Sequence, residues 1–234
     1  VRDKKDDTLN AFDRQPQMMN GLVKDVIATE EFQKIDGDAK SLADHLSEYL
    51  PGLRGAPQAF GITPSSVNWV HANDHFVCRK AHAIPLATNF AEQNTEDEEK
   101  VEAILKYMSP RVCAHLAWRF RAWYKNEKLL SAVACPPFRD ILNDMRAATA
   151  YNSYPYERKP FAIYSCHDVT LLAFLYAIGA DFLVSQEDRE VMPEEGGKYA
   201  RMVDGAVRKR RRRLTWRWWP AYSSTIAFEL VRLD

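Results

Sequence analysis

The chain has 234 residues, of which 46% are hydrophobic and 12% aromatic, and its 32 basic and 32 acidic side chains cancel. This composition is typical of a globular protein of one or two domains and excludes a disordered or collagen-like chain. The balanced charge gives no overall attraction to nucleic acid, and no run of about 18 apolar residues predicts a membrane span.

The N-terminal sequence, VRDKKDD, is strongly charged and starts at Val1. Because it has neither an initiator Met nor the apolar core of a signal peptide, we expect a piece of a longer protein, with any targeting signal upstream. No Asn-x-Ser/Thr acceptor occurs in the sequence. That absence favours an intracellular protein over a glycosylated extracellular one and otherwise leaves the compartment open.

Residues 1–150 are predicted to form a mostly helical subdomain. Pro16 is expected to open a helix that continues through Val26, with Asp13 as its cap. Apolar residues at helical spacing predict further helices at 38–49 and at about 64–81. Two more are expected from Asp97 onward, the second of which continues past Pro136.

The four cysteines are widely separated and show no CxxC spacing. They are Cys78, Cys113, Cys135 and Cys166. This spacing predicts neither a zinc site nor a disulfide framework, so we expect buried free thiols and no metal. Their disulfide status stays open.

A change of periodicity at His167 and Asp168 predicts a junction between a strand and a helix. The short apolar run 161–166 is typical of a buried strand in a parallel sheet. Asp168 or Thr170 is expected to cap the following helix, whose Leu171, Leu172, Leu175 and Ile178 pack inward and which ends at Gly179. Open α/β sheets bind ligands at such junctions, and the free N–H groups of the helix start favour an anion.

His167 and Asp168 are also residue types that transfer protons. Two interpretations stay open at this point. Either the pair is catalytic, or Asp168 is only a helix cap above a structurally hydrogen-bonded His167, and spacing alone favours the second.

The segment 183–217 is polar and is predicted to be an exposed loop. Residues 201–217 hold eight basic side chains against one acid, Asp204, and six of the eight form the run Arg208–Arg213. Such a run can bind nucleic acid, anionic lipid or an import receptor, although a solvated loop is the favoured interpretation. Base stacking by the neighbouring Trp216, Trp218 and Trp219 is the less favoured alternative to packing. The alternating sequence from Tyr222 onward predicts a strand.

Three segments resemble motifs of the histidine acid phosphatases, the second branch of the histidine phosphatase superfamily. YSCHDVTLLAFLYAIG is similar to the His-Asp motif of that family, WWPAYSSTIAFEL to its closing segment, and NDHFVCRKAHAIP to its helical Ala-His-x-x-Pro stretch, represented by Ala81, His82 and Pro85. We expect His82 to be structural, at a helix end. The three motifs occur in the family's order over residues 66–234. His-Asp-Val-Thr is most similar to the lysophosphatidic acid phosphatase type 6-like subgroup.

The resemblance implies an α/β fold. Residues 158–234 would form the C-terminal part of the phosphatase core, an incomplete parallel or mixed sheet flanked by helices, with a basic loop insertion at 183–217. Residues 1–150 would supply the helical subdomain, made of the remainder of the cap and core helices.

The resemblance further implies hydrolysis of phosphomonoesters through a phosphohistidine, without a cofactor. Carried over by motif, His167 stabilises the transferred phosphoryl group and Asp168 protonates the leaving alkoxide. The substrate stays open among lipid (such as a lysophospholipid), sugar and protein phosphates, and a nucleic-acid partner is not expected.

One essential motif has no match in the chain. The family's nucleophile belongs to an Arg-His-Gly motif, which occurs nowhere in these 234 residues. Apart from His167, the chain has five histidines, and none of them follows an arginine or precedes a glycine. They are His45, His71, His75, His82 and His115. We therefore expect the C-terminal fragment of an enzyme, inactive alone. The alternative is a non-catalytic phosphatase-like domain that binds anionic or phosphorylated partners through His167, the helix start and Arg208–Arg213.

Overall fold

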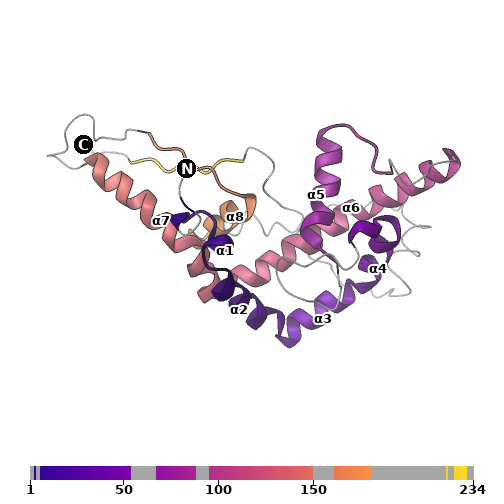
Figure 1. Ribbon diagram of the computed structural model, residues 1–234, viewed down its shortest axis with the longest axis horizontal. Coiled ribbons are helices and arrows are strands. Elements are labelled where there is room, and N and C mark those ends of the chain that lie inside the picture. Colours follow the sequence, from indigo (N-terminus) through magenta and orange to yellow (C-terminus); the bar gives the residue numbers. More distant parts are fainter. Residues whose placement is uncertain are drawn as a thin grey trace. The chain divides into compact units, whose positions relative to one another are not determined.

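The computed structural model describes residues 3, 6–53, 67–87, 95–149, 161–180, 220 and 224–230. Helices account for 74% of these residues, and none of them lies in a strand. Within these ranges the protein is therefore helical (Figure 1).

Between residues 6 and 53, four helices are followed by one 3-10 turn. They are α1 Ala11–Arg14, α2 Pro16–Ile27, α3 Glu30–Asp38, α4 Lys40–Tyr49 and η2 Pro51–Leu53. The helix predicted to open at Pro16 is confirmed, but Asp13 is not its cap and lies in α1. α3 is not predicted from the sequence, and Thr29 caps it by accepting the N–H of Phe32 at 3.3 Å.

The later helices include the longest ones within the described residues. They are α5 Trp69–Ala81, α6 Thr95–Tyr124, α7 Glu127–Thr149 and α8 Asp168–Ala177. The helix predicted near residues 64–81 is confirmed, although it begins only at Trp69, because Asn68 Oδ1 accepts the N–H of His71 at 3.1 Å and caps it. The two helices predicted from Asp97 onward are also confirmed. α7 continues through both Pro136 and Pro137.

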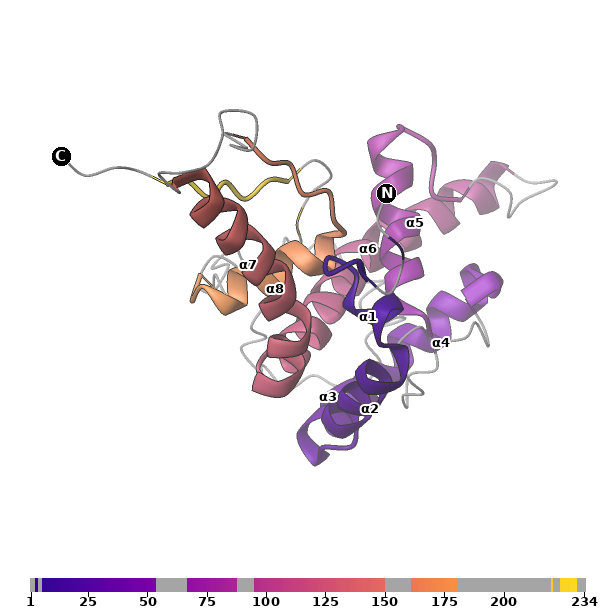
Figure 2. The same cartoon turned by 60° about the vertical axis from the view of Figure 1, so that its left-hand side comes forward.

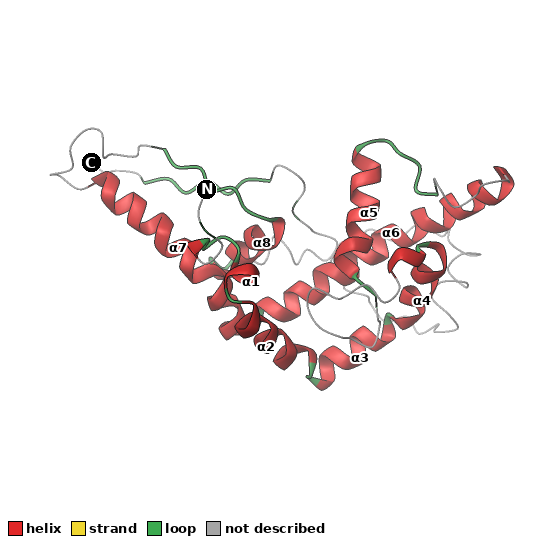
Figure 3. Ribbon diagram, in the orientation of Figure 1, coloured by secondary structure: helices red, strands yellow, loops and turns green. Residues whose placement is uncertain are grey.

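The α/β prediction is wrong for the residues that the structure describes. The run 161–166, predicted to be a strand, is a loop, and so are residues 224–230, the described part of the strand predicted from Tyr222 onward (Figure 3). Phe161 and Ile163 are 79% and 80% exposed, whereas the alternating residues Tyr164 and Cys166 are half-buried. Exposed and half-buried residues therefore alternate from Ile163 to His167, but Ala162 is exposed as well and neither side of the run is fully buried. A strand of a parallel sheet is paired along its edges and covered on both faces, and segment 161–166 lacks this cover.

The described residues divide into two compact units. Unit 1 contains the residues up to Val23, those from Trp123 to 180, Pro220 and 224–230; unit 2 contains Lys24 to Ala122. The last two residues of α6 thus belong to unit 1. The predicted boundary between residues 150 and 158 lies outside the described residues and stays a prediction.

Aromatic packing between α7 and α8 forms the core of unit 1. Phe138 of α7 lies 4.5 Å from Phe174 of α8 between ring centroids, and Phe228 meets both rings edge-on at 5.6 and 6.2 Å. α1 also packs against α7, and Figure 2 shows α7 and α8 in a second view. Full burial of a side chain such as Phe174 stabilises the fold by about 1.5–3 kcal/mol. This packing holds α8 in place.

The predicted end of α8 is confirmed at Gly179, which has a positive φ of 72°. The N–H of Ala180 donates to the carbonyl of Leu175 at 2.8 Å and that of Gly179 to Tyr176 at 3.2 Å, closing the helix in a left-handed cap. Leu172 and Leu175 are buried as predicted, but Ile178 is 49% exposed. Ile178 lies beyond the last helical residue, so helical spacing does not place it on the buried face.

Candidate functional site

His167 and Asp168 lie together at the N-terminus of α8, in unit 1. His167 is the residue preceding the helix, with an extended backbone, and its carbonyl accepts the N–H groups of Thr170 at 3.0 Å and Leu171 at 3.2 Å. Its imidazole is exposed and makes no capping hydrogen bond. The prediction that Asp168 or Thr170 precedes and caps the helix is therefore wrong, because both residues lie within its first turn.

The carboxylate of Asp168 is half-buried and faces the protein on one side. Asp168 Oδ1 accepts the N–H of Val169 at 2.8 Å. Burial raises the pKa of the Cys166 thiol, and the negative charge of Asp168 raises it further. Burial also raises the pKa of Tyr124, and the negative charge of Asp168 raises it further. The charge of Asp168 thus acts on both Cys166 and Tyr124.

This arrangement combines an exposed imidazole, a carboxyl group and the start of a helix. The N–H groups of Val169, Thr170 and Leu171 already donate to Asp168 Oδ1 and to the carbonyl of His167. The first turn still carries the positive end of the helix dipole, which favours an anion such as phosphate. The carboxyl and imidazole groups are able to donate and accept protons beside it.

Comparison of the chain with known protein families, curated proteins and solved structures finds no match. The resemblance to histidine acid phosphatases therefore depends on the residues of its three motifs. In the Ala-His-x-x-Pro motif, the N–H of His82 donates to the carbonyl of Cys78 at 3.0 Å, and its side chain is exposed. Arg79 Nη1 donates to the carbonyl of Pro85 at 2.6 Å. In the structure this motif terminates α5 and holds the chain that follows.

A second polar cluster lies in the interior of unit 2. Asp36 of α3 is completely buried, and its Oδ1 accepts hydrogen bonds from His115 Nε2 at 2.9 Å and from Arg119 Nη1. His115 and Arg119 lie one turn apart on α6. We call these three residues the Asp36 cluster.

Aromatic rings surround the Asp36 cluster. The His115 ring lies 4.3 Å from Trp69 and 5.2 Å from Trp118 between centroids, and the guanidinium of Arg119 lies 5.1 Å from the Phe32 ring. Burial lowers the pKa of His115, and Arg119 lowers it further, although the hydrogen bond and charge of Asp36 act in the opposite direction. The apolar surroundings therefore favour the neutral form of His115.

The Asp36 cluster is suited to holding α3 against α6 rather than to chemistry. The side chains of His115 and Arg119 are 9% and 4% exposed, which leaves almost no surface for a substrate. In the sequence, His115 is one of the histidines that lack the Arg-His-Gly context of the family's nucleophile. No local pattern indicates which residues it contacts. The spacing of four residues between His115 and Arg119 places them on one face of α6, but Asp36 lies 79 residues away and carries no local signal.

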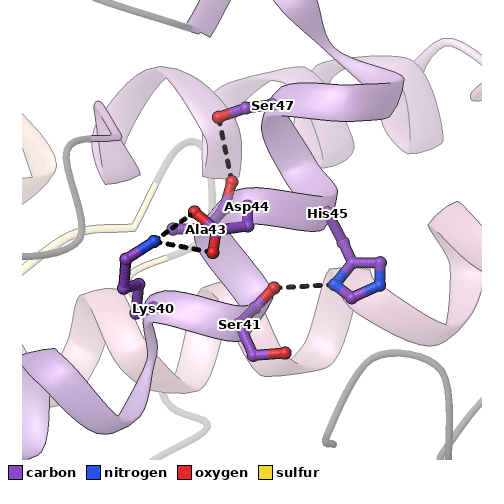
Figure 4. A network of polar contacts seen from close by, with 6 residues as sticks. All are labelled: Lys40, Ser41, Ala43, Asp44, His45 and Ser47. Atoms are coloured by element: carbon purple, nitrogen blue, oxygen red, sulfur yellow. Dashed lines mark hydrogen bonds and ion pairs between the residues drawn. The ribbon is translucent and has the colours of Figure 1, made fainter.

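α4 carries a polar network of a different kind on its surface (Figure 4). Lys40 Nζ lies 2.7 Å from Asp44 Oδ2, and both side chains are more than half exposed. His45 Nδ1 lies 2.8 Å from the carbonyl of Ser41, and Ser47 Oγ donates to the carbonyl of Ala43 at 2.9 Å. All of these contacts join residues one turn apart. They support the helix and do not gather groups from different elements.

The four cysteines are described, and none is in a disulfide. Cys78 and Cys135 are exposed, so the expectation of buried thiols is wrong for these two. Both lie on polar faces of amphipathic helices, which spacing along the whole chain does not reveal. Among the described residues, no group of three or more His, Cys, Asp or Glu side chains is arranged to hold a metal ion.

Two predictions fall outside the described residues. The basic run Arg208–Arg213 and the three neighbouring tryptophans belong to the segment for which no structure is described.

Among the described helices, none is long and apolar enough to span a membrane.

Proposed function

We propose that the chain contributes the proton-donor half of a phosphomonoester hydrolase site. In this proposal Asp168 protonates the leaving alcohol, and His167 stabilises the transferred phosphoryl group. The observation that carries the proposal is their placement at one helix N-terminus, with His167 exposed and Asp168 as the first helical residue. The positive end of the helix dipole at such a helix start favours a phosphate group.

The proposed reaction proceeds through a phosphohistidine. An attacking histidine forms a nitrogen–phosphorus bond while the bond from phosphorus to the alcohol oxygen breaks, and the protonated carboxyl of Asp168 transfers its proton to that oxygen. Water then attacks the phosphohistidine and gives a proton to the Asp168 carboxylate as inorganic phosphate forms. The attacking histidine belongs to an Arg-His-Gly motif that these 234 residues do not contain. The chain by itself is therefore expected to be inactive.

The proposed partner is a phosphomonoester of an alcohol, such as a lysophospholipid or a sugar phosphate. An alkoxide is a poor leaving group, so a positioned proton donor contributes most for esters of this kind. Nothing in the proposed chemistry requires a metal or an organic cofactor.

Two assays test the proposal. For the 234-residue chain, we expect hydrolysis of p-nitrophenyl phosphate and of an alkyl phosphate to be no faster than for Asp168→Asn. Turnover that this substitution abolishes would contradict the expectation. In a form of the protein that also contains an Arg-His-Gly histidine, Asp168→Asn should slow the alkyl phosphate far more than p-nitrophenyl phosphate, whose leaving group hardly needs a proton. Equal losses on both substrates would remove Asp168 from the acid role.

The absence of an Arg-His-Gly motif favours a second candidate, a non-catalytic module that binds phosphorylated or anionic partners at the same helix start. The two candidates differ in one observable property. A binding module holds phosphate through His167 but shows no turnover in any form of the protein, whereas the first candidate requires turnover in the form that carries the nucleophile.

A further inference from the structure

The hydroxyl group of Tyr124 makes a direct contact with the first turn of α8. Tyr124 is the last residue of α6 and is only 1% exposed. Its hydroxyl donates a hydrogen bond to the carbonyl of Val169 at 2.8 Å. This carbonyl belongs to the peptide group between Val169 and Thr170, so the bond holds the backbone one residue beyond the proposed proton donor.

The ring of Tyr124 is fixed along the same helix. Its centroid lies 5.8 Å from that of Tyr176, which lies about two turns beyond Val169 on α8. A buried ring in contact with both ends of α8 has little freedom to rotate its hydroxyl group away from Val169. Burial and the charge of Asp168 raise the pKa of Tyr124, so the phenol remains protonated and continues to donate.

A second hydrogen bond joins the first turn of α8 to the N-terminal segment of the chain. Thr170 is 3% exposed, and its Oγ1 donates to the carbonyl of Leu9 at 2.9 Å. The adjacent Thr8 is itself fixed, because its Oγ1 donates to Asp140 Oδ2 of α7 at 2.7 Å. Two consecutive residues after Asp168 are thus bound to different elements of unit 1.

We propose that Tyr124 is a positioning residue for the His167–Asp168 pair, fixing the first turn of α8 so that the pair faces a bound phosphoryl group. This inference rests on the proposed function. A misplacement of about 1 Å at a reacting group costs on the order of a hundredfold in rate, so a catalytic helix start needs such supports. Tyr124 acts through the peptide backbone and does not contact the substrate itself.

The test compares Tyr124→Phe with a matched control in the same unit. Tyr164 is another tyrosine of unit 1, half-buried where Tyr124 is buried, and its hydroxyl donates to Asp144 of α7 instead of to α8. Each variant of the 234-residue chain is labelled with ¹⁵N and titrated with inorganic phosphate. The NMR signals of residues 167–170, including the ring of His167, report binding. Hydrogen exchange at residues 169–172 reports the order of the turn.

We expect Tyr124→Phe to weaken phosphate binding about five- to tenfold, as expected for the loss of one buried hydrogen bond. Exchange at residues 169–172 should accelerate by a similar factor. Tyr164→Phe should leave both measurements at the wild-type values. An unchanged affinity in Tyr124→Phe, or an equal loss in Tyr164→Phe, overturns the inference.

Failure of the proposed function gives a different pattern. If phosphate shifts none of the signals of residues 167–170 in the wild-type chain, or if His167→Gln binds phosphate as tightly as the wild type, the proposed phosphate site is wrong. Hydrogen exchange still decides the positioning role in that case. An unchanged exchange rate in Tyr124→Phe rules out that Tyr124 fixes the turn, and acceleration confined to Tyr124→Phe supports it.

Discussion

Asp36 and Arg119 form an ion pair in the interior of unit 2, with 0% and 4% of their side chains exposed. The neighbouring His115 binds the same carboxylate oxygen. Removing one member of a buried ion pair leaves the other charge without compensation in a medium of low polarity. The pair therefore makes unit 2 sensitive to single substitutions.

Asp36→Asn is expected to lower the free energy of unfolding of unit 2 by about 3–5 kcal/mol, because the Arg119 charge remains buried. Urea unfolding followed by hydrogen exchange at α3 and α6 measures this loss. The matched control is Asp44→Asn, which removes the exposed ion pair with Lys40 and should cost less than about 1 kcal/mol. The double variant Asp36→Leu with Arg119→Met should be much closer to the wild type than Asp36→Asn is. Equal losses for the two single variants would contradict this account.

The stability of unit 2 should fall at acidic pH because of His115. Burial lowers the pKa of His115 in the folded protein below the value of about 6.5 that it has in the unfolded chain. Below about pH 6.5 the unfolded chain thus binds more protons at this residue than the folded chain. The stabilising contribution of neutral His115 is present above that pH and is lost as the pH falls through the folded pKa.

The pH effect is measured as the difference between the wild type and His115→Gln in the midpoint of urea unfolding. This difference should shrink as the pH is lowered from about 7 to about 5. Replacement of the exposed His71 by Gln is the control and should change the midpoint of urea unfolding little, because surface substitutions usually cost less than about 0.5 kcal/mol. A difference that is constant over this range would show that His115 does not titrate differently in the two states.

Two glycines of unit 1 should respond in opposite directions to alanine. Gly179 has a φ of 72°, which an L-residue adopts at a cost of about 1–2 kcal/mol, so Gly179→Ala should destabilise unit 1 by that amount. Gly21 lies inside α2, where an added methyl group would meet open space, so Gly21→Ala should stabilise by about 0.5–1 kcal/mol. Thermal unfolding of both variants checks the prediction. Stabilisation by Gly179→Ala would be incompatible with a left-handed cap.

The exposed apolar face of segment 161–166 should limit solubility. Phe161 and Ile163 are about four-fifths exposed, and adjacent exposed apolar side chains promote self-association. Phe161→Ser with Ile163→Ser should raise the concentration at which the protein aggregates, measured by light scattering, and change stability by less than about 0.5 kcal/mol per site. Phe228→Ser, which removes a ring packed on Phe138 and Phe174, should destabilise unit 1 instead. Unchanged aggregation in the double variant would exclude this face as its cause.

Local sequence signals predicted most of the helices but not the fold class. The helix opened by Pro16 and the helix ended by Gly179 follow from the chemistry of those two residues alone. The class depends on whether the apolar run 161–166 finds partners for its backbone, and such partners lie far away in the sequence. The apolar run predicted burial on both faces and did not reveal that Phe161 and Ile163 are exposed.

The candidate site shows the same division. His167 and Asp168 are neighbours in the sequence, so their common location at the start of α8 was predictable. Their supports were not, because Tyr124 and Leu9 reach the first turn of α8 from 45 and 161 residues away. Asp36 is a comparable case in unit 2, where no local pattern links it to His115.

The two prolines inside α7 make this helix depend on its packing against α8. Neither Pro136 nor Pro137 has a backbone N–H, so two consecutive hydrogen bonds are missing in the middle of this helix. Each half of α7 is no longer than the roughly 12–15 residues at which an isolated helix is marginal in water. α7 is therefore poorly suited to nucleate folding by itself. The packing of Phe138, immediately after the prolines, on Phe174 of α8 supports the helix at the point where its own hydrogen bonds are missing.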